Sequence, residues 1–160
     1  MKEKDNPEET KSPAVARAVA LFTISDFNCA ESVLLAATES LKKCTPSIPC
    51  VATAFGGGMG RKGSVCGALT GALMVLGVVH GRTKPSDDKE KIYGLTRTLY
   101  DDFVGKFGSP FCSELIECSL ATPEGRDKYH KANLRDVKCK NYVAFCTERL
   151  AEMLAPLLSG

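Results

Sequence analysis

The most constraining feature of the sequence is a segment, residues 65–80, that is apolar almost all the way round when drawn as a helix. Ser64 precedes it as a helix cap, and Gly81 follows it as a stop signal. A helix without a polar face must be covered on all sides by other elements. The sequence therefore predicts a central buried helix with further helices packed around it.

One face of this predicted helix carries only small residues. Gly67 and Gly71 stand four positions apart, as do Ala68 and Ala72, and residues at this spacing share a helix face. A face without bulky side chains allows the backbone of a neighbouring element to come close. We therefore expect tight helix packing here, and the same face is compatible with a homodimer.

Elsewhere the apolar residues recur at helical spacing rather than in the alternation typical of strands. Helices are predicted to begin at Pro13, after the cap Asn28 and after the cap Thr122, and to span residues 65–80, 89–107, 112–116 and 136–154. One short strand is predicted at residues 51–55. The expected fold is all-α: a single-domain bundle of about five or six helices, with a glycine-rich loop before the buried central helix. Residues 1–11 are predicted to be a flexible polar tail, and residues 12–160 the helical domain.

Charge and hydropathy exclude several classes of protein. The formal net charge is only +2, which argues against a nucleic-acid partner, because such proteins usually carry a basic surface. The longest apolar run, residues 67–79, is shorter than the ~18–20 residues needed to cross a membrane. The polar N-terminus resembles neither a secretion signal nor a transit peptide, so we expect a cytoplasmic protein.

The glycine-rich stretch FGGGMGRKGSVCGALTG, residues 55–71, raises the question of a nucleotide site. A P-loop needs Gly-Lys followed by Ser or Thr, whereas Lys62 here lies between Arg61 and Gly63. Residues 58–63 match the G-x-G-x-x-G pattern of dinucleotide-binding proteins, but the βαβ context of that pattern is missing from the predicted elements. We therefore do not expect a nucleotide to bind.

The eight cysteines are the strongest functional signal. Without an export signal, such a number favours metal binding or redox chemistry over a disulfide framework. No C-x-x-C occurs, so neither a thioredoxin-like dithiol nor a zinc ribbon is supported, and there is no C-x-x-C-H for covalent haem. Any site must be assembled from distant segments, and ligation by sulfur alone favours an iron–sulfur cluster or structural zinc.

Four of the cysteines fall near predicted helix N-termini: Cys29, Cys66, Cys112 and Cys139. The amides at a helix N-terminus favour thiolate over thiol, so we expect a lowered pKa for these four groups. The other four cysteines are Cys44, Cys50, Cys118 and Cys146, and we expect them to be buried or inert thiols. Cys118 and Cys146 are the first exceptions we would expect to this rule, because each lies close to one of the four favoured cysteines.

These segments together resemble the C_GCAxxG_C_C family of redox-active proteins. The resemblance extends over about residues 14–155 and rests on Asn28-Cys29-Ala30, FGGGMG at 55–60, CGALTG at 66–71, Cys112, LIECSLATPEGRD at 115–127 and Cys139. It implies that Cys29, Cys66, Cys112 and Cys139 are the four hallmark cysteines. A related domain occurs in split-Soret cytochromes, which are dimeric, transfer electrons and have been linked to an iron–sulfur centre. This chain lacks their haem-attachment motif, so only the cluster can be carried over.

The leading hypothesis is electron transfer or redox sensing by an iron–sulfur cluster bound to the four hallmark cysteines. The backbone of the glycine-rich segment is expected to approach the cluster at Gly57, Gly58, Gly60, Gly63 and Gly67. Arg61 and Lys62 are expected to offset the negative charge of the cluster or to dock an acidic partner. The alternatives are a metal-free thiol–disulfide protein and a structural zinc protein. The redox partner protein, and whether a substrate is turned over, stay open.

Overall fold

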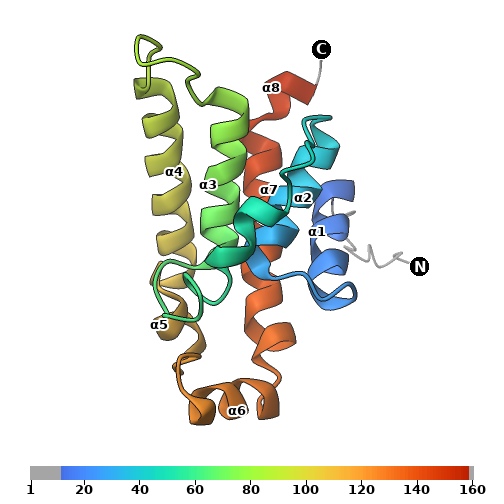
Figure 1. The fold of residues 1–160 in the computed structure, drawn as a ribbon, viewed down its shortest axis with the longest axis vertical. Coiled ribbons are helices and arrows are strands. Elements are labelled where there is room, and N and C mark those ends of the chain that lie inside the picture. The colour runs from blue at the N-terminus through green and yellow to red at the C-terminus, as the bar shows by residue number, and fades with distance from the viewer. Residues whose placement is uncertain (1–11, 159–160) are drawn as a thin grey trace, which may run out of the picture.

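The computed structural model describes residues 12–158, and these form a single all-α domain (Figure 1). The predicted tail, residues 1–11, lies outside the described residues. The elements are α1 (Pro13–Thr23), α2 (Cys29–Ser40), the 3-10 helix η1 (Cys50–Phe55), α3 (Gly67–His80), α4 (Glu90–Phe107), α5 (Cys112–Ile116), α6 (Pro123–Lys131), the π-helix η2 (Arg135–Cys139), α7 (Lys140–Met153) and α8 (Ala155–Leu158). Six α-helices have nine residues or more, in agreement with the predicted bundle.

Helix α3 is the centre of the bundle, as predicted. It contacts α2, α4 and α7, and Figure 1 shows it between these helices. Leu69 and Leu76 on this helix are fully buried. Other helices of the same chain therefore cover the apolar side chains of this helix.

The small face of α3 packs against α2. A Cβ added at Gly71 would lie 2.5 Å from the carbonyl oxygen of Ala30, far closer than carbon and oxygen can approach. Glycine is required here because the two backbones meet. The predicted tight packing is thus found within the chain, and a homodimer stays a prediction that needs another surface.

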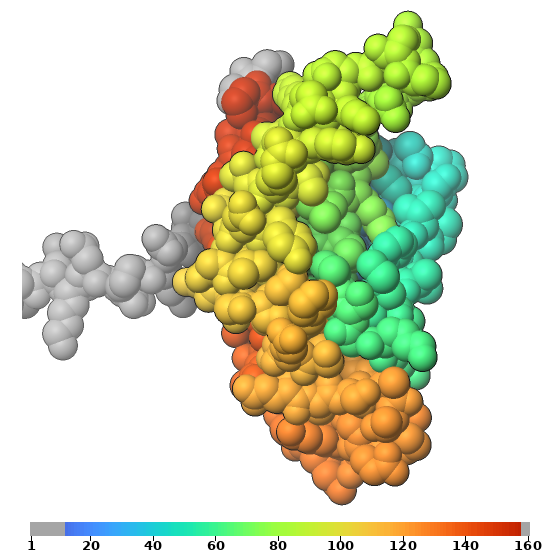
Figure 2. All heavy atoms as spheres, turned by 90° about the vertical axis from the view of Figure 1, so that its left-hand side faces the viewer, coloured from blue at the N-terminus to red at the C-terminus, as the bar shows by residue number. Residues whose placement is uncertain are grey.

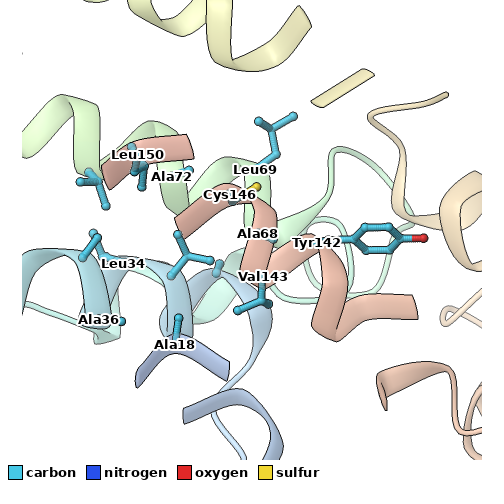
Figure 3. Packing of buried hydrophobic residues seen from close by; sticks show 14 of the residues in the cluster. Ala18, Leu34, Ala36, Ala68, Leu69, Ala72, Tyr142, Val143, Cys146 and Leu150 are labelled. Carbon is cyan, nitrogen blue, oxygen red and sulfur yellow. The ribbon is translucent and has the colours of Figure 1, made fainter. Parts of the chain in front are cut away.

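The core contains one cysteine that is far from solvent. Cys146 of α7 is fully buried in the same cluster as Ala68 and Leu69 of α3, and Figure 3 shows the three side chains near one another. Val143, one turn earlier on α7, is also fully buried. Cys146 therefore acts as a small apolar core residue.

The predicted strand at residues 51–55 is wrong. This segment is the 3-10 helix Cys50–Phe55, in which Ala52 alone is buried. A short apolar run does not distinguish strand from helix, and strand pairing is absent here because the described residues contain only an isolated bridge between Val65 and Phe111.

Because of the same bridge, the central helix begins later in the sequence than predicted. The amide of Cys66 donates to the carbonyl of Pro110 at 2.8 Å, so Val65 and Cys66 run extended beside the start of α5. Helix α3 consequently begins at Gly67, two residues after the predicted position, with Cys66 as its N-cap.

The last predicted helix, residues 136–154, is divided in two. Its first turn is the π-helix Arg135–Cys139, and the α-helix α7 follows from Lys140. Single π-turns are rare and frequently mark functional sites. The division lies at the fourth hallmark cysteine.

One end of the bundle is closed by α6, which lies across it (Figure 1). Thr122 caps this helix through a bond from the amide of Gly125 to its hydroxyl, 3.1 Å long, and Pro123 occupies the first position, as predicted. In Figure 2 the glycine-rich loop, in teal and green, borders the orange segment that contains α5 and α6. The loop and these two helices therefore share one end of the molecule.

Candidate functional site

The four hallmark cysteines line one cavity at this end of the bundle. Its volume is about 600 Å³, and Cys29, Cys66, Cys112 and Cys139 all contribute to the wall. They come from segments far apart in the sequence, yet the fold brings all four together.

Three of the four thiols lie at a helix start, as the sequence predicted, and the fourth lies at the junction of η2 and α7. Cys29 is the first residue of α2, and Cys112 the first of α5. Cys66 is the N-cap of α3, and Cys139 ends η2 directly before α7. Backbone amides at the starts of α2 and α3, those of Ala30 and Ala68, lower the pKa of Cys29 and Cys66. At the starts of α5 and α7, by contrast, the amides of Cys112 and Lys140 are bonded to backbone carbonyls.

A capping box fixes the position of Cys29. The amide of Glu31 donates to the Asn28 side chain at 3.0 Å, and the Asn28 amide donates to the Glu31 carboxylate at 2.8 Å. The Asn28 side chain also donates to the carbonyl of Thr53 at 3.0 Å. The start of α2 is thereby tied to η1, the element that leads into the glycine-rich loop.

The glycine-rich loop contains an unusual backbone turn. Residues 57–61 all have φ between +59° and +69°, a short left-handed run that includes Met59 and Arg61. Left-handed conformation costs a residue with a side chain roughly 1–2 kcal/mol. Strained backbone of this kind is concentrated at functional sites.

The loop is held to α5 by backbone bonds. The amide of Cys112 donates to the Ser64 carbonyl at 2.7 Å, and the amide of Ser113 donates to the Gly63 carbonyl at 3.2 Å. A Cβ at Gly63 would meet the Ser113 side chain at 2.7 Å. The loop is therefore joined to the start of α5, which carries Cys112.

Three of the predicted loop positions lie beside the thiols. The amide of Gly57 donates to the Cys29 sulfur, and both Gly57 and Gly60 line the cavity. A Cβ at Gly58 would lie 2.8 Å from the Cβ of Cys112. Only Gly58 of the three is needed for a close approach to a cysteine, because a Cβ at Gly57 would meet Arg61 and one at Gly60 would meet no atom within 4 Å.

Gly67, the fifth predicted glycine, packs directly against the first thiol. A Cβ at this position would collide with the Cys29 sulfur and lie 2.9 Å from the Phe55 carbonyl oxygen. The residue after Cys66 must therefore be glycine for Cys29 to occupy its place.

The predicted lowering of the thiol pKa values is wrong for the protein without metal. Burial raises the pKa of Cys29 and Cys66, and it raises the pKa of Cys112 and Cys139 to about 12 each. The amides at the helix starts act in the predicted direction on Cys29, but loss of solvation is larger. The thiols are therefore protonated near neutral pH until a ligand displaces the protons.

The four sulfurs line the wall and do not converge on one point. Within residues 12–158, no group of three or more cysteine, histidine or acidic side chains is arranged to hold a single metal ion.

The sequence matches the family described as "Putative redox-active protein (C_GCAxxG_C_C)" over residues 27–153. The chain belongs to this family. No curated protein and no solved structure matches it. In the described part of the C_GCAxxG_C_C domain, none of the helices has the length and apolar character of a membrane span.

Two residues of the C_GCAxxG_C_C site, Tyr129 and Arg135, could not be predicted from the sequence. The hydroxyl of Tyr129 on α6 donates to the Cys139 sulfur at 3.6 Å. Arg135 stacks on the ring of Phe22, with 4.1 Å to the ring centroid, and donates to the carbonyls of Phe22 and Phe27. Both contacts join segments distant in the chain, which no local pattern reports.

Arg135 also supplies positive charge to the thiols. It lowers the pKa of Cys29 and of Cys139, opposing the effect of burial on each. Of the two cations predicted from the loop, Arg61 lines the cavity, whereas Lys62 is exposed and lies outside its lining.

The other four cysteines separate into three environments. Cys44 and Cys50 are exposed, and Cys146 is buried in the core. Cys118 is half-buried beside the cavity, where its charge acts on the pKa of Cys112 and Cys139. Cys146 is therefore a buried thiol and no exception to the expected buried or inert state, whereas an additional role for Cys118 stays a prediction.

Proposed function

We propose that this redox-active protein transfers electrons, or senses redox state, through an iron–sulfur cluster bound by Cys29, Cys66, Cys112 and Cys139. The observation that carries the proposal is that four cysteines from four distant segments line one cavity. A bound cluster would supply one-electron oxidation and reduction. The protein residues would hold it, hydrogen-bond its ligands and limit its exposure to water.

The surroundings of the thiols fit a negatively charged sulfur centre. The Gly57 amide and the Tyr129 hydroxyl each donate to a hallmark sulfur. Arg135 places a guanidinium near two of the four, and backbone amides at the starts of α2 and α3 act on Cys29 and Cys66. Hydrogen bonds and charges of this kind set the potential of iron–sulfur proteins.

The geometry of the four sulfurs favours a cluster over a structural zinc ion. A structural zinc ion requires its sulfurs at about 2.3 Å from one centre, whereas a cluster connects ligands that do not converge on one atom. Thiolate is required both for thiol–disulfide exchange and for binding of iron or zinc, so the burial that raises the pKa of all four thiols does not separate these chemistries.

The test is anaerobic purification of the full chain, followed by an absorption spectrum and counts of iron, sulfide and zinc. We expect a coloured protein that contains iron and sulfide. Cys66→Ser should lose the iron, whereas Cys44→Ser, which alters an exposed thiol outside the cavity, should retain it.

Each alternative has its own outcome. A colourless, iron-free chain under reducing conditions contradicts the proposal, and near-stoichiometric zinc would assign the site to a structural ion. Metal-free protein that reversibly loses two or four reactive thiols on oxidation would assign it to disulfide chemistry.

A further inference from the structure

The cavity is lined by more positively charged side chains than the one, Arg135, that acts on the pKa of the thiols. Besides Arg135, its lining includes the cations Arg61 and Arg126, and also the imidazole ring of His130. None of these three is among the charges that shift the pKa of Cys29 or Cys139, whereas Arg135 acts on both. The arginines of the lining therefore form two groups: Arg135, which acts on both thiols, and a second group made of Arg61 and Arg126.

The second group lacks acidic partners. Asp26 is the one carboxylate among the described residues that line the cavity, and it is paired with Arg135 at 3.3 Å. Arg126 donates to the carbonyl of Leu120 at 2.9 Å and keeps further donors. Within residues 12–158, neither Arg61 nor Arg126 forms an ion pair.

Part of the remaining wall is apolar. Ile116, Leu120 and Phe22 line the same cavity. Its volume of about 600 Å³ lies within the range of small-molecule sites, ~300–1,000 Å³. Such sites combine an apolar wall with a few polar groups that orient the ligand.

We infer that the cavity also binds a small organic anion, with its carboxylate or phosphate on Arg61, Arg126 and His130 and its apolar body against Ile116 and Leu120. The ligand shares the cavity with the four thiols and lies on the wall that carries the second group of cations. Arg61 is exposed in the strained loop and Arg126 belongs to α6, so the anion would connect the two segments. The inference concerns the proposed redox site, but binding itself does not require the metal.

The test compares two fluorescent probes of similar shape on the metal-free full chain. Anilinonaphthalene sulfonate has an apolar body and an anionic group, and N-phenylnaphthylamine has a similar body without charge. We expect the sulfonate to bind more tightly. Arg61→Gln and Arg126→Gln should each weaken its binding by about tenfold, the effect of one charge-assisted hydrogen bond, and leave the neutral probe unaffected.

Lys62→Gln is the matched control for Arg61→Gln, because it removes a positive charge from the next residue, which lies outside the cavity lining. This variant should bind both probes as the unaltered chain does. Circular dichroism before titration confirms that each variant is folded.

Three results would overturn the inference: unchanged sulfonate binding in the Arg61→Gln, Arg126→Gln double variant, equal weakening of both probes, or equal weakening by Lys62→Gln. Loss of sulfonate binding when iron and sulfide are assembled would contradict simultaneous occupation of the cavity by the anion and the cluster. Because the probe measurement needs no iron, an iron-free chain contradicts the proposed function alone.

Discussion

At the scale of single residues, Cys139 has the most contacts of functional interest. It ends the π-turn η2, its sulfur accepts a hydrogen bond from Tyr129, and Arg135 at the other end of the same turn lowers its pKa. Burial still dominates and keeps that pKa at about 12. The tyrosine and the arginine are therefore placed to stabilise negative charge that the protein interior otherwise disfavours.

The Tyr129 hydroxyl predicts a shift in reduction potential. A donor to a ligand sulfur stabilises the more negative, reduced state, so Tyr129→Phe should lower the potential of the iron-loaded protein. One hydrogen bond contributes about 0.5–1.5 kcal/mol, which corresponds to tens of millivolts for one electron. Protein-film voltammetry measures the shift, and Tyr93→Phe on the exposed surface of α4 is the control. An unchanged potential at full iron content would contradict this role.

At the scale of elements, local signals predicted the helix starts well. Asn28 and Thr122 cap α2 and α6 because a cap depends on residues within one turn. The 3-10 helix at Cys50–Phe55 and the π-turn at Arg135–Cys139 could not be predicted in this way. The first contains too few residues to show a period, and the second adjoins long-range bonds from Arg135.

The capping box of α2 should contribute measurably to stability. Asn28→Ala removes the acceptor for the Glu31 amide and the bond to Thr53, so we expect a loss of about 1–2 kcal/mol in unfolding free energy. Asn28→Ser keeps a capping oxygen and should recover part of that loss. Urea unfolding at equilibrium gives both values, and a serine variant no more stable than the alanine variant would argue against capping.

The glycines of α3 should separate into two classes. Gly71→Ala places a methyl group against the Ala30 carbonyl and should destabilise the fold by about 1–3 kcal/mol. Gly77→Ala on the same helix meets no atom within 4 Å and should stabilise it by up to about 1 kcal/mol through helix propensity. Paired denaturation curves test this contrast. Equal midpoints for the two variants would show that α2 and α3 can separate without cost.

At the scale of the whole molecule, the fold class and the hallmark cysteines could be predicted, but their chemical state could not. Helical periodicity and an apolar central segment sufficed for the bundle, because each follows from local sequence. The pKa of Cys66 depends on burial beneath elements from distant parts of the chain. Burial outweighs the helix-start effect expected from its position, and only the assembled structure reveals it.

Because burial raises the thiol pKa more than the helix starts lower it, we can predict the order in which the thiols react in the metal-free chain. Exposed Cys44 and Cys50 should be alkylated first by iodoacetamide at a pH near ~8.5, the usual thiol pKa. Cys112 and Cys139, with pKa values of about 12, would hold a thiolate fraction on the order of a thousandth or less. Their alkylation should accelerate as pH rises toward that value.

Peptide mapping by mass spectrometry after timed pulses resolves each site, and a denatured sample gives the rates without the fold. Half-buried Cys118 should react at an intermediate rate, and Cys146 should react only when the bundle opens. If Cys112 reacted as fast as Cys44 in the native chain, the cavity thiols would be thiolates. The helix starts would then outweigh burial, and thiol–disulfide exchange would become the better account of this redox protein.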